Sequence, residues 1–391
     1  MKMNLGVFFG GSSVEHEVSV ISALQAMNSM DSEKYNIIPV YVTKSGEMYT
    51  GAVLRNVESF KNINELLKKC SRVTFIRMDQ KVMMLSEKHG AFKLKNGIVI
   101  DFAFPIVHGT NCEDGTIQGF VEALALPYAE CNILSSSVGM DKILFKDVMK
   151  SNELPVVDGF GFTSREWVEN GTSIAEKIQN EIGFPVIVKP ANLGSSVGIS
   201  KVSDMASLQE KVNYASQFAS RILVEKAITK LREINCSVLG DASNCNASVC
   251  EEPIMSDEIL SYDDKYKSNS ASKGMSGLSR IIPAKISNEK TVEIQDIAKK
   301  VFKVIDCCGV VRIDFLIDES DNDKVYINEI NTIPGSLAFY LWKETGKEYK
   351  ELLDDIIRLG MKRDRDRKNL MFTYDTNILE NGAFGAKGAK K

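Results

Sequence analysis

The 391-residue sequence has no long hydrophobic run, few histidines and no excess of basic residues. No segment offers about 18 consecutive apolar residues, so we expect no membrane-spanning helix. Three histidines are too few to favour a His-rich transition-metal site. A formal net charge of -4 argues against a nucleic-acid surface, where basic residues dominate. The eight cysteines contain no CxxC pair, which predicts reduced thiols and a cytoplasmic protein.

The composition is that of a globular protein with a sizeable core, because 44% of the residues are hydrophobic and 26% are charged. Strands and helices alternate in the first third, and this βαβ pattern predicts a parallel sheet with helices on its faces. We expect those elements at residues 5–9, 14–30, 37–42, 101–107 and 115–126. Residues 261–279 are polar and have the composition of a lid loop. The expected units are an N-terminal α/β domain (1–130), a central subdomain (131–222), a C-terminal subdomain (223–362) and a charged, flexible tail (363–391).

Two runs near the end of the chain alternate apolar and polar residues, which predicts adjacent antiparallel strands. Arg312 and Asp314 then share one face of the first strand, and Glu329 and Asn331 share one face of the second. Carboxylate and amide oxygens suit Mg²⁺, which keeps positions open for phosphate oxygens. Taken alone, the pattern fits the solvent face of an amphipathic hairpin equally well. The two predicted strands cover residues 310–318 and 325–331.

Two loops after predicted N-terminal strands carry polar side chains. In residues 10–19, Glu15 and Glu17 stand at a helix start, so this loop suits a substrate ammonium better than a phosphate. The same acids also fit a purely structural role in stabilising the helix start. The loop lacks the third glycine of a dinucleotide fingerprint. His108 ends another strand of the same sheet and is expected to face the same crevice, because parallel strands bind ligands at their carboxyl ends.

The strongest phosphate signal is residues 189–198, where a strand ends in Lys189 and a glycine-serine loop follows. The backbone N–H groups of such a loop can approach oxygens closely. A Walker loop differs, because its lysine follows the glycines. Lys142 is a second candidate cation. Glu225 ends a strand whose backbone could pair with a flat base such as adenine, although a plain connector fits as well.

Eight segments, taken in order, resemble the D-alanine–D-alanine ligase family of the ATP-grasp superfamily. They are GGSSVEHEVS from Gly10, HGTNCEDGTIQG from His108, MDK from Met140, FPVIVKPANLGSSVGISKV from Phe184, VEK from Val224, YDDKY from Tyr262, RIDF from Arg312 and NEINTIPGS from Asn328. Eight ordered motifs are far more specific than one. The resemblance implies a mixed α/β and α+β fold, in which an N-terminal parallel βαβ (pre-ATP-grasp) domain precedes a two-subdomain ATP-grasp fold.

The resemblance implies ATP-dependent ligation of two D-alanines to D-alanyl-D-alanine through an acyl phosphate, for peptidoglycan precursors. It also implies a homodimer and two magnesium ions, which manganese can replace. D-Serine is a rival second substrate, as in vancomycin-resistance ligases, because Tyr340, Leu341 and Trp342 stand where many members place serine, leucine and proline. D-Lactate fits less well because Tyr266 is retained. A non-catalytic ATP-binding regulator is a further alternative, and the retained Arg312 argues against it.

The resemblance also implies a role for individual residues. Catalysis would involve Glu15, Ser195, Tyr266, Arg312 and Gly335, and amino-acid binding Val18, His108, Lys265, Tyr340 and Leu341. ATP would be bound by Lys142, Lys189, Gly194, Ser195, Ser196, Glu225, Lys226 and Glu233, and magnesium by Asp314, Glu329 and Asn331. Within these sets, Ser195 and Tyr266 would close a hydrogen-bonded link to Glu15, and Lys265 would reach the carboxylate of the second amino acid.

Overall fold

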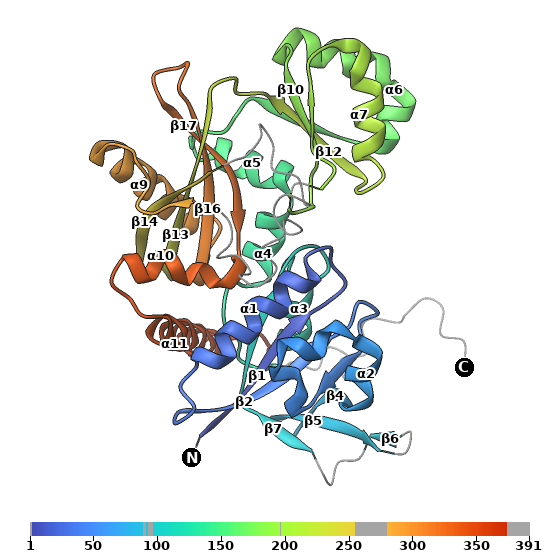
Figure 1. Ribbon diagram of the computed structural model, residues 1–391, viewed down its shortest axis with the longest axis vertical. Helices are drawn as coiled ribbons and strands as arrows, with labels where there is room; N and C mark the ends of the chain where they lie inside the picture. The colour runs from blue at the N-terminus through green and yellow to red at the C-terminus, as the bar shows by residue number, and fades with distance from the viewer. Residues whose placement is uncertain (1, 89–90, 93–96, 196, 255–279, 374–391) are drawn as a thin grey trace, which may run out of the picture.

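The computed structural model describes residues 2–88, 91–92, 97–195, 197–254 and 280–373. These residues form three sheets that follow one another along the long axis of the molecule (Figure 1). The N-terminal domain occupies one end, the sheet of the C-terminal subdomain lies in the middle, and the central subdomain occupies the other end. Among the described residues, no helix is both long and apolar enough to span a bilayer.

The N-terminal domain contains the parallel strands that the sequence predicts. Strand β1 (Met3–Gly10) pairs in parallel with β2 (Tyr35–Val42) on one side and with β8 (Phe102–Val107) on the other. Gly10 lies opposite both Val42 and Val107, so the three strands end at one edge of the sheet. The helices that follow β1 and β8 are α1 (His16–Ser29) and α3 (Thr116–Ala123). The loops bearing Glu15 and His108 therefore begin side by side.

The sheet continues into an antiparallel extension, which the sequence analysis did not predict. The strand order is β6-β5-β4-β3-β2-β1-β8, with β7 beside β5. The turn between β4 and β5 places Asp79 and Gln80 at positive φ without a glycine, so the usual hairpin signal is missing. The added elements are β3 (Met48–Thr50), η1 (Ala52–Arg55), η2 (Val57–Lys61), α2 (Ile63–Lys68), β4 (Ser71–Met78), β5 (Lys81–Lys88), β6 (Ala91–Phe92) and β7 (Ile98–Ile100).

The central subdomain is a four-stranded antiparallel sheet in the order β11-β10-β12-β9. Its core joins Val188 and Val224 of the strands to Trp167 and Leu208 of the helices, and α6 and α7 lie together on one side of the sheet (Figure 1). The elements are β9 (Gly159–Thr163), α6 (Ser164–Lys177), the π-helical turn η4 (Ile178–Ile182), β10 (Val186–Pro190), β11 (Ser200–Val202), α7 (Met205–Ala215) and β12 (Arg221–Lys226). The neighbouring strands β10 and β12 thus carry Lys189 and Glu225.

The C-terminal subdomain is a five-stranded antiparallel sheet in the order β15-β14-β13-β16-β17. The strand pair that the alternation predicts is confirmed as β16 and β17. The apolar face of the sheet shares one core with Phe302 of α9 and with Phe145 and Met149 of α5. The elements are α4 (Ile133–Met140), α5 (Lys142–Ser151), β13 (Leu231–Gly240), β14 (Cys245–Pro253), β15 (Arg280–Ile281), α9 (Asn288–Val304), β16 (Gly309–Asp318) and β17 (Lys324–Asn331). Helix α5, which we assigned to the central subdomain, therefore packs with this sheet.

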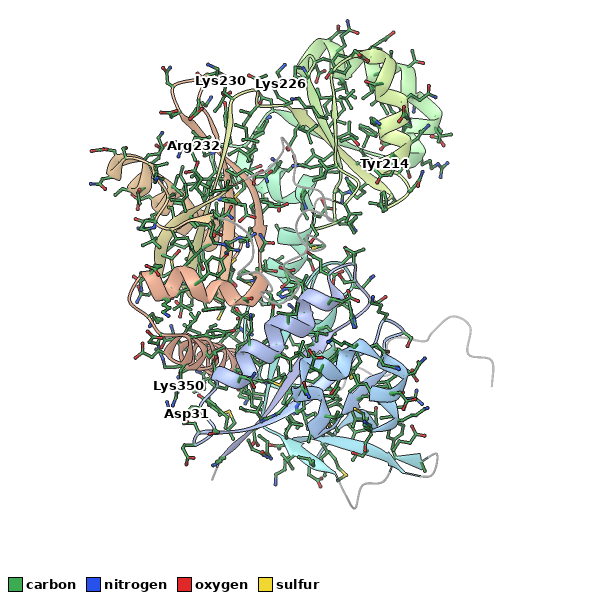
Figure 2. All side chains as sticks on the ribbon, viewed as in Figure 1. Asp31, Tyr214, Lys226, Lys230, Arg232 and Lys350 are labelled. Atoms are coloured by element: carbon green, nitrogen blue, oxygen red, sulfur yellow. The ribbon has the colours of Figure 1, made fainter. Side chains whose placement is uncertain are left out.

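The last elements return to the N-terminal domain. They are η6 (Gly335–Ala338), α10 (Phe339–Glu344) and α11 (Tyr349–Lys368). Leu352 and Ile356 of α11 enter the N-terminal core, and Lys350 pairs with Asp31 at 3.0 Å (Figure 2). Residues 363–368, which we expected to begin a flexible tail, belong to α11, and Arg363 donates to the carbonyl of Tyr128 at 2.7 Å.

Candidate active site

One face of the five-stranded sheet carries the polar residues that the alternation of β16 and β17 predicts. Arg312 lies opposite Asn331, and Asp314 lies opposite Glu329. The Nε and Nη2 atoms of Arg312 each donate to an oxygen of Asp314 at 2.7 Å. The Nδ2 of Asn331 donates to Asp314 Oδ2 at 3.1 Å. A guanidinium, two carboxylates and an amide therefore share one surface.

This donor set fits a hard divalent cation. A carboxylate offers roughly four lone-pair directions, and three donors occupy Asp314, so one direction remains for a metal. Burial raises the pKa of Asp314 although Arg312 opposes the shift. Within the described ranges, no group of three or more His, Cys, Asp and Glu could hold an ion by itself. Two carboxylates and an amide would instead share the ion with phosphate oxygens.

A cleft of about 280 Å³ lies between the four-stranded and five-stranded sheets. It gathers lysines, the glycine-serine loop and acidic residues from distant parts of the chain. The expected ATP and metal residues among those lining it are Lys142, Lys189, Gly194, Ser195, Glu225, Lys226, Glu233, Asp314 and Glu329. The Nζ of Lys142 pairs with Glu329 at 3.0 Å and donates to the carbonyl of Leu193 at 2.9 Å. Burial opposes the charge on Lys142, but Glu329 outweighs it and raises the pKa.

Lys189 and Glu225, which line this cleft, belong to a buried ion triad. The carboxylate of Glu225 pairs with Lys189 and, at 2.7 Å, with Lys146. Burial disfavours the charge on Glu225, but the two ammonium groups outweigh it and lower the pKa to about 2. Glu225 lines the cleft, as expected for a residue near the nucleotide base. Its carboxylate, however, is paired with Lys146 and Lys189. Sequence reasoning missed Lys146, although its position one turn after Lys142 on the amphipathic α5 was an available signal.

The glycine-serine loop meets the N-terminal domain at Glu15. The hydroxyl of Ser195 donates to Glu15 Oε1, which is the Ser195 part of the expected link; Tyr266 lies outside the described residues. A Cβ on Gly194 would lie 2.6 Å from Glu15 Oε2, so only glycine allows this close approach. The backbone N–H of Glu15 donates to Ser13 Oγ at 3.0 Å. A carboxylate from the N-terminal domain therefore contacts the loop that lines the cleft.

His108 and an acid that sequence reasoning missed join β8 to the segment after β17. The ring nitrogens of His108 lie 2.8 Å from the carbonyl of Ile333 and 3.0 Å from Ser22 Oγ. Burial lowers the pKa of His108 to about 4, so the ring is neutral. Glu113 accepts from the backbone N–H groups of Gly109 at 3.1 Å and Ile333 at 3.0 Å. The position of Glu113 between Gly109 and Gly115, in the loop after His108, was the sequence feature that could have identified it.

Comparison with known proteins agrees with this arrangement. Residues 4–131 match the family model described as D-ala D-ala ligase N-terminus, and residues 148–358 match D-ala D-ala ligase C-terminus. The chain belongs to the D-alanine–D-alanine ligase family. A D-alanine–D-alanine ligase of Thermosipho melanesiensis is 42% identical over 378 residues, covering 97% of this chain and 98% of that protein. Its counterpart in Caldicellulosiruptor bescii is 38% identical over 386 residues, with 96% and 99% covered.

Solved structures of family members have the same fold. The D-alanine–D-alanine ligase of Coxiella burnetii aligns with a TM-score of 0.78 at 29% identity, covering 94% of this chain and 96% of that chain. The VanG D-Ala:D-Ser ligase of Enterococcus faecalis aligns with a TM-score of 0.76 at 28% identity, covering 92% and 100%. The ATP-grasp architecture that the resemblance implies is therefore confirmed.

Several residues with family-based roles lie outside this cleft or outside the described residues. The hydroxyl of Tyr340 donates to Glu251 at 2.9 Å, and the side chain of Leu341 is fully buried in α10. Val18 is buried on α1. Gly335 begins η6 beside α1, where Ser336 donates its backbone N–H to Ser22 Oγ at 2.9 Å. Ser196, Lys265, Tyr266 and the expected lid at residues 261–279 fall outside the described residues.

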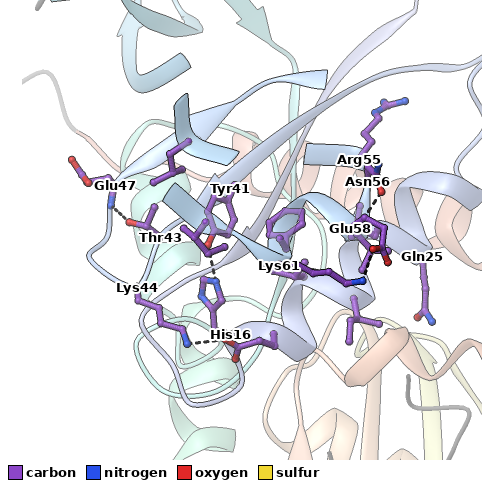
Figure 3. A pocket seen from close by; sticks show the side chains of 18 of the residues that line it. His16, Gln25, Tyr41, Thr43, Lys44, Glu47, Arg55, Asn56, Glu58 and Lys61 are labelled. Carbon is purple, nitrogen blue, oxygen red and sulfur yellow. Dashed lines mark hydrogen bonds and ion pairs between the residues drawn. The ribbon is translucent and has the colours of Figure 1, made fainter. Parts of the chain in front are cut away.

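A larger hollow of about 1490 Å³ lies in the N-terminal domain (Figure 3). It is lined by Val20, Ile21 and Leu24 of α1, a different face of the helix from that bearing Val18 and Ser22. His16 Nε2 and Tyr41 OH lie 2.9 Å apart at its wall. None of the residues with family-based roles lines this hollow.

Proposed function

We propose that this chain is a cytoplasmic, ATP-dependent D-alanine–D-alanine ligase that supplies D-alanyl-D-alanine for peptidoglycan. The observation that carries the proposal is the convergence of Lys142, Lys189, Asp314 and Glu329 on one cleft, whose glycine-serine loop is bonded to Glu15. Relatives at up to 42% identity over nearly the whole chain carry this name. All eight cysteines are free thiols, which fits a reducing compartment.

In the first step, a carboxylate oxygen of the first D-alanine would attack the γ-phosphorus of ATP and displace ADP, leaving an acyl phosphate. Protein groups assist phosphoryl transfer mainly by positioning and by offsetting charge. Lys142 and Lys189 would contact the phosphates, and the backbone of the loop at Gly194 and Ser195 would cover them. Glu15 would hold the ammonium of the first D-alanine beside this loop.

In the second step, the amine of the second amino acid would attack the acyl carbon. The tetrahedral oxyanion would then expel phosphate as the amine loses its proton. Arg312 would stabilise that oxyanion, together with the backbone N–H of Gly335. His108 is neutral and hydrogen-bonded through both nitrogens, so its role would be to hold the start of the loop after β8 against Ile333.

Asp314, Glu329 and the amide oxygen of Asn331 would hold magnesium. When bound, the metal would offset the charge that develops on the phosphates. The Nζ of Lys142 lies 3.0 Å from Glu329 Oε2, so the same carboxylate would serve the metal and the lysine. The number of ions and the ability of manganese to replace them remain predictions of the family resemblance.

The test is ADP release with ATP, Mg²⁺ and D-alanine, followed by mass spectrometry of products from a mixed pool of D-amino acids. D-Alanyl-D-alanine as the main product supports the proposal. Predominant D-alanyl-D-serine would transfer the assignment to the activity named for VanG, whose structure aligns at a TM-score of 0.76. Tight ATP binding without turnover would favour a regulator instead. Homodimerisation is a separate prediction, which light scattering of the purified chain checks.

A further inference from the structure

A row of polar residues crosses the five-stranded sheet on the face that carries Asp314. Glu329 lies opposite Asp314, Asp314 lies opposite Asn235, and Asn235 lies opposite Glu251. Residues directly opposite one another in a sheet point to the same side. Glu251 of β14 therefore belongs to the same surface as the carboxylates proposed to hold magnesium, at the other end of the row.

Glu251 is the centre of a buried polar cluster, and only 2% of this residue is exposed. Its Oε1 accepts from Tyr340 OH at 2.9 Å and from Asn235 Nδ2 at 3.1 Å. Its Oε2 pairs with Arg280 Nη1 at 3.2 Å. The guanidinium of Arg280 also lies 4.2 Å from the centre of the Tyr340 ring. An ion pair and a stacked aromatic ring therefore hold this arginine in one orientation.

The position of the cluster connects it with the amino-acid end of the site. Asp314 and Glu329 line the cleft, so under the proposed function an amino acid joined to the γ-phosphate there would extend along the polar face. Arg312 lies two residues from Asp314 on the same face of β16, and its guanidinium is close enough to Glu251 and Tyr340 to interact with both electrostatically. Helix α10 packs against β14 and β13, and Trp342 Nε1 donates to Ser237 Oγ of β13 at 2.9 Å. Tyr340 and Arg280 thus border the region beyond Arg312.

We propose that Arg280 binds the α-carboxylate of the second D-amino acid and that Glu251 and Tyr340 are positioning residues for its guanidinium. This inference rests on the proposed ligase function. The hydroxyl of Tyr340 is committed to Glu251 and does not replace the serine that many family members place here. A planar guanidinium presents its N–H donors as a fixed fork that matches the two oxygens of a carboxylate.

The test compares D-alanine with D-alaninamide, which lacks the carboxylate, as the second substrate. Wild-type enzyme prefers D-alanine, and Arg280→Gln reduces that preference, measured as the ratio of kcat/KM values, by on the order of 10- to 100-fold. The KM for ATP stays near the wild-type value. The matched control is Arg232→Gln, because Arg232 pairs with Glu252 at 2.8 Å on the opposite face of the same strands. This control leaves the preference unchanged.

A second variant covers the case in which Arg280→Gln does not fold. Tyr340→Phe keeps the ring and removes only the bond to Glu251, and a preference lowered by about 2- to 10-fold is expected. An unchanged preference in both folded variants overturns the inference. Absence of dipeptide synthesis by the wild-type enzyme overturns the proposed function instead, so the two failures are distinguishable.

Discussion

Replacing Lys146 with methionine tests how the buried triad prepares Lys189 for ATP. Lys146, Glu225 and Lys189 together carry one net positive charge, and loss of Lys146 leaves a neutral pair. Glu225 then acts on Lys189 alone, so Lys189 offers less charge to the phosphates. Because Lys146 does not line the cleft, its effect on ATP passes through Glu225. We expect the KM for ATP to rise about tenfold, which corresponds to about 1.4 kcal/mol.

The assay is ADP release at varied ATP and saturating D-alanine, with a thermal melt of each variant. Lys146→Met also removes the ion pair with one oxygen of Glu225, which should lower the free energy of unfolding by about 1–3 kcal/mol. Lys146→Arg keeps the charge and should restore most of the ATP affinity. Lys150→Met changes an exposed lysine on the same helix and serves as the matched control. A folded Lys146→Met enzyme with the wild-type KM for ATP would refute the reasoning.

Three further changes test other parts of the site. Glu329→Gln should abolish ADP release with little change in the melting temperature, because Glu329 is proposed to hold magnesium; normal turnover would remove it from the metal site. Ser195→Ala should raise the KM for the first D-alanine about tenfold, since one hydrogen bond to the charged Glu15 is lost; an unchanged KM would show that the link does not position Glu15. His108→Asn should make the free energy of unfolding depend less on pH. Burial lowers the pKa of His108 to about 4, so folding favours the neutral ring. The wild-type protein therefore loses stability as the pH falls from about 6.5 to about 4, by at most about 3 kcal/mol. Equal slopes in denaturant titrations of both proteins over that range would contradict the assignment.

Alternating strands were the most predictable part of the molecule. Arg312 and Asp314 are two residues apart, so in a strand they must lie on the same face. The short connection between β16 and β17 made the pairing of these two strands easy to predict. The strand ends at Lys189 and His108 were visible for a similar reason, because apolar runs stop there. Such local patterns determine which side chains share a surface.

Long-range packing was the part that local patterns could not supply. The burial of Lys146 depends on Glu225 of β12, and no residue near Lys146 in the chain indicates that partner. The role of Glu251 depends on Tyr340, which enters from α10. Residues 363–368 of α11 looked like the start of a charged tail, because a contact that holds them, from Arg363 to the carbonyl of Tyr128, is made with the N-terminal domain. In each case the partner comes from a segment distant in sequence.

The most direct test of the central claim follows the carboxylate oxygens of the first substrate. D-Alanine labelled with ¹⁸O in its carboxylate is incubated with the enzyme, ATP and Mg²⁺, and the released phosphate is analysed by mass spectrometry. The account predicts ADP as the nucleotide product and one ¹⁸O atom in each phosphate, because the attacking oxygen leaves with phosphorus. Dipeptide formed with unlabelled phosphate, or with AMP as the product, would contradict it.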